Sequence, residues 1–489
     1  MEYMSVYKNT PEVEVRERRL HSTLSYNGDA ADLIEKSKNR QLSTKTRYYS
    51  QCSNCAEGCA ETTTLHIRDA AVVGHAPIGC ASGASMANVT SRSVTTARGQ
   101  RLHAVKYIST NIQEKDTVFG ASEKLRGAIA EADRRFQPKA IFIESSCASG
   151  IIGEDLESIA SEAEAKLGYP VIPIYCEGFK SKIWSTGFDA AYHGILRRLV
   201  KPAEKKQEDL VNIFNFEGAD TFSPLLKKVG LRVNYLAPLA SVEDLAHISE
   251  AACSTQICET LATYVSAVLE EKYGVPEVNA PSPFGIDWTD RWLREIGKIT
   301  HREEIVEQVI AEEHARIEPE IAELRKELEG KTAYVISGDS FAHNLGNIVK
   351  EFGVKLIGFN ALHHDAHTDR EQQSNTLADL VQSNGNIPNV SVCNKQPYQV
   401  AKIIKDIKPD FILVRHMQLT TLATKLGIPV LFEGDANFSS CYDGTLKMGR
   451  RLVEALKTKK LVENIAAHSE FPYTDWWMNE VDDPFYFNK

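Results

Sequence analysis

Residues 332–361, TAYVISGDSFAHNLGNIVKEFGVKLIGFNA, contain two short apolar runs separated by one amphipathic segment. The runs are rich in valine, isoleucine and aromatic residues, and the second begins directly after a glycine. Short apolar runs of this kind are typical of buried parallel strands, and the segment between them has the length of a helix. This stretch therefore predicts a strand–helix–strand unit with parallel strands.

The same alternation continues along most of the chain. Further apolar runs lie at 70–75, 139–146, 169–177, 211–216, 231–237, 389–394, 410–415 and 428–434. Amphipathic segments with helical spacing lie at 122–136, 153–168, 244–274 and 302–330. We therefore predict an α/β protein with three doubly wound, Rossmann-like parallel-sheet domains, in which ligands bind at the carboxyl ends of the strands.

Changes in composition suggest where these domains begin and end. Residues 1–50 are polar and predict an N-terminal arm, followed by α/β domains at 51–210, 211–331 and 332–489. The chain ends in HSEFPYTDWWMNEVDDPFYFNK, with seven aromatic residues among 22. Because such a tail is too apolar to remain in water, we expect it to dock across a subunit interface or to cover a cofactor pocket.

Charge and hydropathy narrow the classes of partner. The formal net charge of −10 argues against nucleic acid or an acidic membrane as the main partner. No run of 18 apolar residues is present, so no transmembrane helix is expected. The N-terminus also lacks the apolar core of a secretory signal. We therefore expect a cytoplasmic protein whose cysteines stay reduced.

Three of the ten cysteines, Cys55, Cys80 and Cys147, fall where strands adjoin loops. The stretch QCSNCAEGC, residues 51–59, contains Cys52, Cys55 and Cys59, whereas Cys80 and Cys147 follow predicted strands. Thiolates at strand ends, which an α/β fold brings together, suit an iron–sulfur cluster.

Two other interpretations of the cysteines remain open at this point. The three cysteines of QCSNCAEGC, with one histidine, form a possible zinc site, although their spacing is not a standard zinc pattern. A buried cysteine can also act simply as a small hydrophobic residue. We keep this last interpretation for Cys176 and Cys393, which lie inside apolar runs.

Five motifs in order resemble the α subunit of the nitrogenase component 1 family. They are CAEGCAETTTLHIRDA–VVGHAPIGC (55–80), EKDTVFGASEKL (114–125), SSCASGIIGEDLESI (145–159), CEGFKSKIWSTG (176–187) and ICETLATYVSAVLEEKYGVP (257–276). The resemblance covers most of the chain. It implies an ATP-dependent reductase system, in which this chain pairs with a homologous β subunit in an α2β2 heterotetramer. An iron–sulfur reductase homodimer, the only component to use ATP, would supply the electrons.

The resemblance also implies roles for particular cysteines. Cys55, Cys80 and Cys147 would hold half of a P-cluster-type centre, 8Fe–7S or 4Fe–4S, shared with the β subunit. Cys55 precedes Asp69 by 14 residues and Cys80 by 25, which is the register of the family motif. The other two cysteines of QCSNCAEGC do not fit this register. They would add a ligand on oxidation or only pack in the same loop.

Two further positions acquire roles from the resemblance. Cys258 would ligate one end of a nitrogenase-type iron–sulfur–carbide cofactor, although alone it would pass for a small residue on a helix. Phe119 matches an exposed aromatic residue near the reductase docking site, with a simple core position as the alternative. Whether the cofactor carries molybdenum, vanadium or an organic acid stays open.

The chain departs from nitrogenases in the loop at 176–187. Where the resemblance leads us to expect glutamine and histidine, this chain has Trp184 and Phe188. A phenyl ring cannot relay protons as an imidazole can. Two aromatic side chains instead favour an apolar pocket for a small thioether, unless the loop has merely repacked and Trp184 is a structural plug. The chain is thus most similar to methylthio-alkane reductases, which cleave carbon–sulfur bonds to release methanethiol and a hydrocarbon. A cofactor-maturation scaffold or an alternative nitrogenase is the other possibility.

A second departure concerns the distal end of the cofactor. Nitrogenases are expected to carry a histidine ligand after the last strand, but residues 427–444 contain none. Asp435 or Cys441 is a possible substitute, as is a histidine of HHDAHTD (363–369), namely His363, His364 or His367. That run is alternatively a metal site of its own or simply polar surface.

Overall fold

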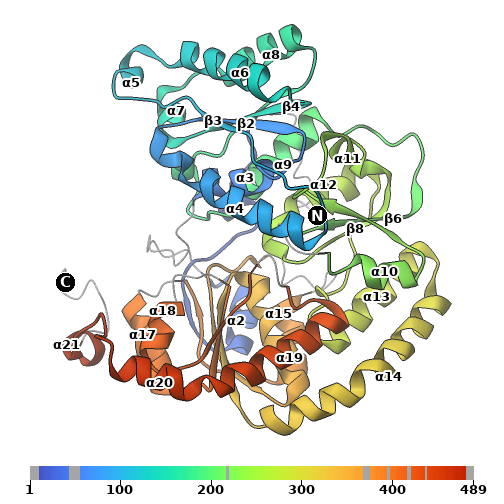
Figure 1. Cartoon of the computed structure of the whole chain (residues 1–489), viewed down its shortest axis with the longest axis vertical. Coiled ribbons are helices and arrows are strands. Elements are labelled where there is room, and N and C mark those ends of the chain that lie inside the picture. Colours follow the sequence, from blue (N-terminus) through green and yellow to red (C-terminus); the bar gives the residue numbers. More distant parts are fainter. Residues whose placement is uncertain are drawn as a thin grey trace. The chain divides into compact units, whose positions relative to one another are not determined.

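The computed structural model describes residues 10–42, 55–215, 220–366, 375–393, 397–415, 420–434 and 438–480. The chain divides into two compact units. Unit 1 comprises residues 1–20, 54–278 and 299–301, and unit 2 comprises residues 21–53, 279–298 and 302–489. Helices and parallel strands alternate along both (Figure 1). The prediction of an α/β protein with three parallel sheets is confirmed.

The first sheet of unit 1 has four parallel strands in the order β3-β2-β4-β5. Its strands are β2 (Ala70–His75), β3 (Tyr107–Ser109), β4 (Ala140–Ser145) and β5 (Val171–Ile174). The helices around it are α3 (Ala56–Thr64), η1 (Ile78–Ala81), α4 (Ser82–Ala97), α5 (Asp116–Phe119), α6 (Ser122–Phe136), α7 (Cys147–Ile152), α8 (Leu156–Leu167), η2 (Gly178–Lys180) and α9 (Thr186–Arg198). Apolar side chains of α6, α8 and the strands form one buried cluster.

The second sheet of unit 1 has three parallel strands in the order β7-β6-β8. They are β6 (Gln207–Phe214), β7 (Arg232–Leu236) and β8 (Ala251–Gln256). The associated helices are α10 (Ser223–Lys228), α11 (Val242–Ala246), η3 (Ile248–Glu250) and α12 (Glu259–Tyr273), and the short α1 (Arg16–Arg19) also belongs to unit 1. Asp69 joins the two sheets, because its carboxylate accepts a hydrogen bond from the backbone of Val242 at 2.8 Å.

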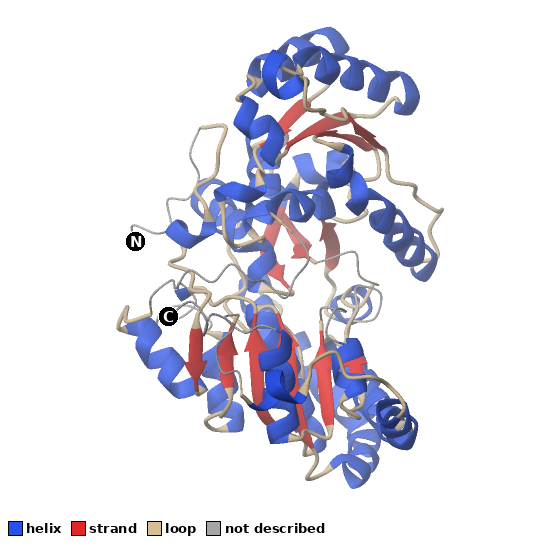
Figure 2. Ribbon diagram, turned by 90° about the vertical axis from the view of Figure 1, so that its left-hand side faces the viewer, coloured by secondary structure: helices blue, strands red, loops and turns tan. Residues whose placement is uncertain are grey.

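Unit 2 is built on a six-stranded sheet in the order β1-β11-β10-β9-β12-β13. The strands are β1 (Tyr26–Gly28), β9 (Thr332–Ser337), β10 (Lys355–Ala361), β11 (Val390–Val392), β12 (Phe411–Val414) and β13 (Val430–Phe432), and only β1 is antiparallel to its neighbour. Figure 2 shows these strands side by side, with helices packed around them. The predicted unit at 332–361 is therefore confirmed as β9, α15 (Asp339–Val349) and β10.

The remaining helices of unit 2 surround this sheet. They are α2 (Ala30–Lys38), most of α13 (Ile286–Thr300), α14 (Glu303–Leu328), η4 (Lys350–Phe352), α16 (Thr376–Asn384), α17 (Pro397–Ile407), α18 (Thr420–Lys425), α19 (Cys441–Lys457), α20 (Lys459–Ala467) and α21 (Asp475–Asn479). The two longest, α14 and α19, pack against each other (Figure 1). Among the described residues, no helix combines the length and the apolar character needed to cross a membrane.

Most of the predicted elements are present, but one long helix is not. The ten apolar runs all contain strands, and the helices predicted at 122–136 and 302–330 are α6 and α14. The segment 244–274 was expected to be one helix, and this prediction is wrong, because β8 interrupts it. Residues 251–256, AACSTQ, lack a strand-like pattern, so pairing with β6 rather than intrinsic propensity determines their conformation.

Two segments near the ends of the chain, residues 26–38 and 471–478, pack into unit 2. Residues 26–38, within the expected arm at 1–50, form the edge strand β1 and helix α2. In the aromatic tail, Phe471, Tyr473 and Met478 pack against a buried cluster of unit 2 that includes side chains of α17 and β12. This part of the tail therefore packs on its own unit, whereas residues 481–489 lie outside the described ranges.

Candidate functional site

Two of the predicted cluster cysteines follow neighbouring parallel strands. Cys80 lies in η1, just after β2, and Cys147 is the first residue of α7, just after β4. Since β2 and β4 are paired in parallel, their carboxyl ends meet at one edge of the sheet. Cys55 occupies the N-cap position of α3. Cys52 lies outside the described residues.

Gly178 shows that the cysteines converge. This residue follows β5, which is the strand beside β4. A Cβ atom at Gly178 would lie 3.5 Å from the Sγ of Cys55 and 3.5 Å from the Sγ of Cys147. Two sulfur atoms 92 residues apart in sequence thus lie near the same point, and the absence of a side chain at Gly178 lets the backbone approach them closely.

The cysteine site is also electrostatically unusual. The side chain of Glu57 is hydrogen-bonded to that of Cys80. Burial, and then the carboxylate of Glu57, raise the pKa of Cys80 to about 12. Partial burial also raises the pKa of the Cys55 thiol, although the residue as a whole is exposed. Without a bound metal the thiols of Cys55 and Cys80 are therefore protonated at neutral pH, and a cation that coordinates these two thiols must displace protons.

A group of buried carboxyl groups extends from Glu57, which contacts Cys80, and sequence reasoning missed it. Glu57, Glu61 and Glu144 are all nearly inaccessible to solvent. Burial raises the pKa of Glu57 to about 7, and it raises the pKa values of Glu61 and Glu144 as well. The Thr64 hydroxyl donates a hydrogen bond to Glu144 at 2.5 Å. The available signal was Glu57 and Glu61 four residues apart on α3, with an acid inside the apolar run of β4.

Replacing Glu61 by glutamine should stabilise the protein at alkaline pH. A carboxyl group whose pKa is raised by folding contributes stability below its unfolded pKa, and this contribution is lost as the pH rises through the folded pKa. Glu61→Gln cannot ionise, so we expect little change in the free energy of unfolding at pH 4, which is below the ordinary pKa of a glutamate, and a gain of about 1–2 kcal/mol at pH 8. Chemical denaturation at both pH values measures this.

The exposed Glu162, which pairs with Arg126 at 3.2 Å, provides the control. Glu162→Gln should change stability by less than about 1 kcal/mol at either pH. A loss of stability at pH 8 in Glu61→Gln would contradict the proposed protonation of this carboxyl group.

Cys258 lies at the carboxyl end of the second sheet. It follows β8, is buried, and caps the N-terminus of α12. The neighbouring strand β6 ends at Phe214. The next residue is Asn215, whose buried amide oxygen and nitrogen make no hydrogen bond among the described residues. The soft thiol of Cys258 can coordinate a metal cluster, and the Asn215 amide can donate a hydrogen bond to that cluster.

Trp184 and Phe188 form an aromatic pair at the start of α9. Their ring centroids are 5.9 Å apart at an interplanar angle of 77°. Phe188 is buried and Trp184 is half-buried. A Cβ atom at Gly187 would lie 1.9 Å from the carbonyl oxygen of Ala56, so only glycine permits this approach. The aromatic pair is therefore adjacent to the helix that begins after Cys55.

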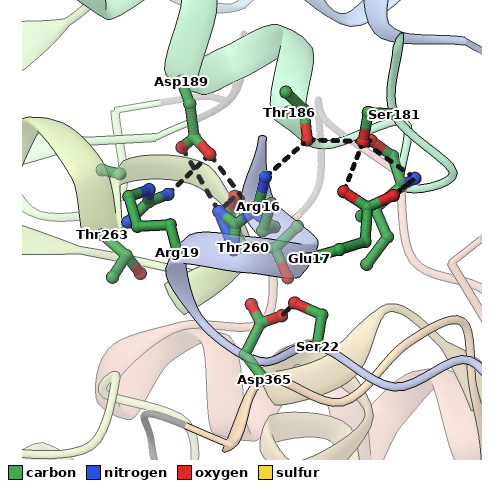
Figure 3. A network of polar contacts seen from close by, with 12 residues as sticks. Arg16, Glu17, Arg19, Ser22, Ser181, Thr186, Asp189, Thr260, Thr263 and Asp365 are labelled. Carbon is green, nitrogen blue, oxygen red and sulfur yellow. Dashed lines mark hydrogen bonds and ion pairs between the residues drawn. The ribbon is translucent and has the colours of Figure 1, made fainter. Parts of the chain in front are cut away.

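Two buried arginines hold α9 in place. Arg19 Nη2 lies 2.6 Å from Asp189 Oδ2, and Arg16 Nε lies 3.4 Å from the same oxygen (Figure 3). Arg16 Nη2 also donates to the backbone carbonyl of Thr260 at 2.7 Å. Since Asp189 follows Phe188 and Thr260 lies two residues after Cys258, this network links the aromatic pair to the N-terminus of α12.

Asp189→Asn should strongly destabilise unit 1. Both arginines are buried, so removing the carboxylate leaves two buried positive charges without the negative charge that neutralises them. We expect a loss of about 3–5 kcal/mol in the free energy of unfolding. Asp209 pairs with Arg232 at 2.6 Å on the surface of unit 1, and Asp209→Asn should cost less than about 1 kcal/mol. Equal losses in the two variants would contradict the importance of the buried network.

A single carboxylate connects three of the family-like motifs. Glu154, from the motif at 145–159, accepts hydrogen bonds from the backbone of Ala121 and from the hydroxyl of Ser122 at 3.0 Å. It also contacts the imidazole of His75, which lies five residues before Cys80. Burial lowers the pKa of His75. Glu154 thus fixes the loop after α5 relative to the strand that leads to Cys80.

Phe119 lies at the surface. It ends α5, with 86% of its side chain exposed, and its neighbour Val118 is 75% exposed. The alternative that Phe119 is a core residue is therefore wrong. Ile151 on α7, which contacts α5, is also exposed.

The remaining candidates lie in unit 2 or outside the described residues. His363 and His364 are buried, so the interpretation of this pair as polar surface is wrong. Cys441 is buried as well, and burial raises its pKa far above the usual value. Asp435 and His367 lie outside the described residues. Cys176 and Cys393 are buried, as expected for small hydrophobic residues.

Comparison with known proteins identifies the family. The model of the family described as nitrogenase component 1 type oxidoreductase matches residues 55–457. The chain therefore belongs to this family of oxidoreductases.

Individual relatives support the same assignment. The nitrogenase molybdenum-iron protein alpha chain of Methanosarcina barkeri is 33% identical over 318 residues, which span 62% of this chain but only 59% of the relative. The nitrogenase iron-molybdenum cofactor biosynthesis protein NifE of Methanococcus maripaludis is 30% identical over 387 residues, 77% of each chain. The solved structure of nitrogenase Cp1 at pH 5 superposes with a TM-score of 0.71 at 24% identity, covering 86% of this chain and 91% of that one. This last similarity supports the fold.

Proposed function

We propose that this chain is the catalytic α subunit of a nitrogenase-like reductase that cleaves the carbon–sulfur bond of small thioethers. The observation that carries the proposal is the aromatic pair of Trp184 and Phe188, packed beside the helix of a cluster cysteine and linked through Arg16 to the helix of Cys258. The reaction takes two electrons and two protons and converts a methylthio-alkane into methanethiol and a hydrocarbon. The chain would act as a methylthio-alkane reductase.

In this proposal, Cys55, Cys80 and Cys147 hold the α-subunit share of a P-cluster-type iron–sulfur centre. The thiols of Cys55 and Cys147 beside Gly178, and the thiol of Cys80 that interacts with both, fit such a group. A bound iron–sulfur cluster supplies low-potential electron transfer. The chain itself supplies the thiolates, and the buried carboxyl group of Glu57 lies within hydrogen-bond reach of Cys80.

A homologous β subunit would complete this centre. Cys55 and Cys147 are exposed in the isolated chain. Three large apolar side chains beside the cysteines, those of Ile78, Ile151 and Phe179, are also more than half exposed. An exposed apolar surface around incomplete metal ligands favours a protein partner that covers both. An α2β2 assembly is the arrangement we infer.

Cys258 would hold a nitrogenase-type iron–sulfur–carbide cofactor, with the Asn215 amide nearby to orient it. Trp184 and Phe188 would exclude water and receive the alkyl groups of the substrate. They have no group that titrates near neutrality, so they cannot transfer a proton to dinitrogen. This difference favours a thioether over dinitrogen as the substrate.

The electron donor would be a homodimeric, ATP-hydrolysing iron–sulfur reductase, and ATP would bind only to that partner. Val118 and Phe119 on α5 offer an exposed apolar contact for docking. Glu154 connects the loop after α5 with His75 and so with the strand before Cys80. Docking at α5 would therefore act on a rigid connection to the interface cluster.

A cofactor-maturation scaffold is the second candidate. It is favoured by the similarity to the NifE protein, which extends over more of this chain than the similarity to the Methanosarcina alpha chain. The absence of a histidine from residues 427–444 also suits a subunit that releases its cofactor. A scaffold would transfer its cofactor to an apo-dinitrogenase and would produce no methanethiol.

Product analysis of the anaerobically purified complex tests the function. The complex, its iron–sulfur reductase and ATP are supplied with dimethyl sulfide under dinitrogen. We expect methane and methanethiol in equal amounts, with little ammonia. Ammonia as the main product would indicate an alternative nitrogenase, and no product from a complex with intact clusters would favour the scaffold.

A further inference from the structure

A second group of possible metal ligands lies in unit 2, at the carboxyl ends of two inner strands of the six-stranded sheet. Asp339 begins α15, two residues after β9 ends, and His363 lies two residues after β10 ends. Strands β9 and β10 are parallel neighbours, with Ser337 paired to Ala361. This register brings Asp339 and His363 together at the carboxyl ends of these two strands.

Asp365 completes the group. One ligand atom from each of Asp339, His363 and Asp365 lies within 4.8 Å of the other two. The three residues are only 3%, 0% and 2% exposed. Chance groups of acids and histidines on a surface are open to water, whereas this group is enclosed by the protein.

Other side chains orient these candidate ligands. The backbone N–H of Asp365 donates to Asp339 Oδ2 at 3.1 Å, and the hydroxyl of Ser22 donates to Asp365 (Figure 3). His364 Nδ1 lies 3.6 Å from Asp339 Oδ1, while its Nε2 is 3.1 Å from the hydroxyl of Ser37. Outer hydrogen bonds of this kind fix the direction of metal ligands.

Charge balance favours a bound cation. Two carboxylates buried this close together repel each other and lose hydration. Two aspartates and one neutral imidazole around a divalent ion would form a site without net charge. His364 and His343 lie 3.6 Å and 3.9 Å from Asp339 and offer a different compensation, in which a protonated imidazole takes the place of the metal. The two arrangements differ in a measurable way, because only one binds a metal.

We propose that Asp339, His363 and Asp365 bind one divalent first-row transition-metal ion. Imidazole combined with carboxylate oxygens suits Zn²⁺, Fe²⁺ or Mn²⁺ better than Ca²⁺. The ion links the ends of β9 and β10 to the segment around Ser22, whose neighbour Thr23 pairs with His364. The inference is independent of whether the protein is a reductase or a scaffold.

Zinc binding to the purified holo-complex tests the proposal. The complex is equilibrated with Zn²⁺, freed of excess ion, and analysed for zinc content and for X-ray absorption at the zinc edge. We expect one zinc per chain with only nitrogen and oxygen neighbours at about 2.0–2.2 Å. Sulfur neighbours at about 2.3 Å would place the zinc on cysteines and would overturn the proposal.

Variants locate the zinc independently. His363→Gln and Asp365→Asn should each weaken zinc binding at least about 100-fold, since each removes a ligand. His314→Gln is the control, because His314 pairs with Asp290 at 2.9 Å in the same unit and is half-exposed. Unchanged zinc binding in both ligand variants, or no zinc in the wild type, would overturn the proposal. If the variants do not assemble, the absorption spectrum of the wild type decides.

Discussion

Cys258→Ala should abolish reduction of the thioether substrate while leaving the interface cluster in place. Among the described residues, the Cys258 thiol is the only group that we assign as a ligand of the catalytic cofactor. Its removal therefore leaves the cofactor without an assigned ligand in this part of the chain. We expect activity to fall by at least about 1,000-fold, because no other described side chain can take over the chemistry. The measurement combines methanethiol production with iron content and electron paramagnetic resonance of the purified complex.

The fold should survive this substitution. Cys258 occupies an N-cap position without a side-chain hydrogen bond to the helix, and Gln256 accepts a hydrogen bond from the backbone of Ala262 in the first turn. Cys253→Ala is the matched control, since Cys253 is buried in β8, five residues earlier. It should retain both clusters and most of the activity. Full activity in Cys258→Ala would contradict the assignment of the cofactor ligand.

Cys55→Ala should remove the interface cluster. Its sulfur faces the same point as that of Cys147, and no other cysteine in the described part of α3 replaces it, because Cys59 is buried within that helix. We expect the cluster signal to disappear and electron delivery to fall by at least about 100-fold, since the cluster lies between the reductase and the cofactor. Iron content and the resonance signal of the reduced complex measure the loss.

The neighbouring cysteines provide the controls for this prediction. Cys59→Ala and Cys52→Ala should both retain the interface cluster, because neither residue has the register of the family motif. Loss of the cluster in Cys52→Ala would show that the register argument selected the wrong thiol. Retention of the cluster in Cys55→Ala would have the same meaning.

The sequence predicted the parallel sheets well because their strands carry the signal themselves. Apolar runs such as 70–75 and 411–414 are buried on both faces, so their composition alone identifies them. The strands β1, β3 and β8 were missed for the opposite reason. Tyr26–Gly28 and Tyr107–Ser109 are three-residue edge strands, and AACSTQ of β8 has no pattern that favours a strand over a helix.

The candidate site was predicted in part. The positions of Cys80 and Cys147 followed from the strands before them, because a parallel sheet brings the carboxyl ends of its strands together. The buried carboxyl groups near Cys55 could not be predicted, because a glutamate on a helix is usually exposed. The convergence of Asp339 and His363 depends on the register of β9 and β10, which hydrophobic patterning does not specify to a single residue.

The number of methanethiol molecules released per cofactor most directly tests whether this chain is catalytic. The purified complex is incubated with its reductase, ATP and a thioether, and its iron content is determined before and after the reaction. We predict many product molecules per complex, strict dependence on ATP, and a cofactor that stays bound. A complex with intact clusters that releases no methanethiol, and instead gives up its cofactor to an apo-dinitrogenase, would contradict the catalytic role.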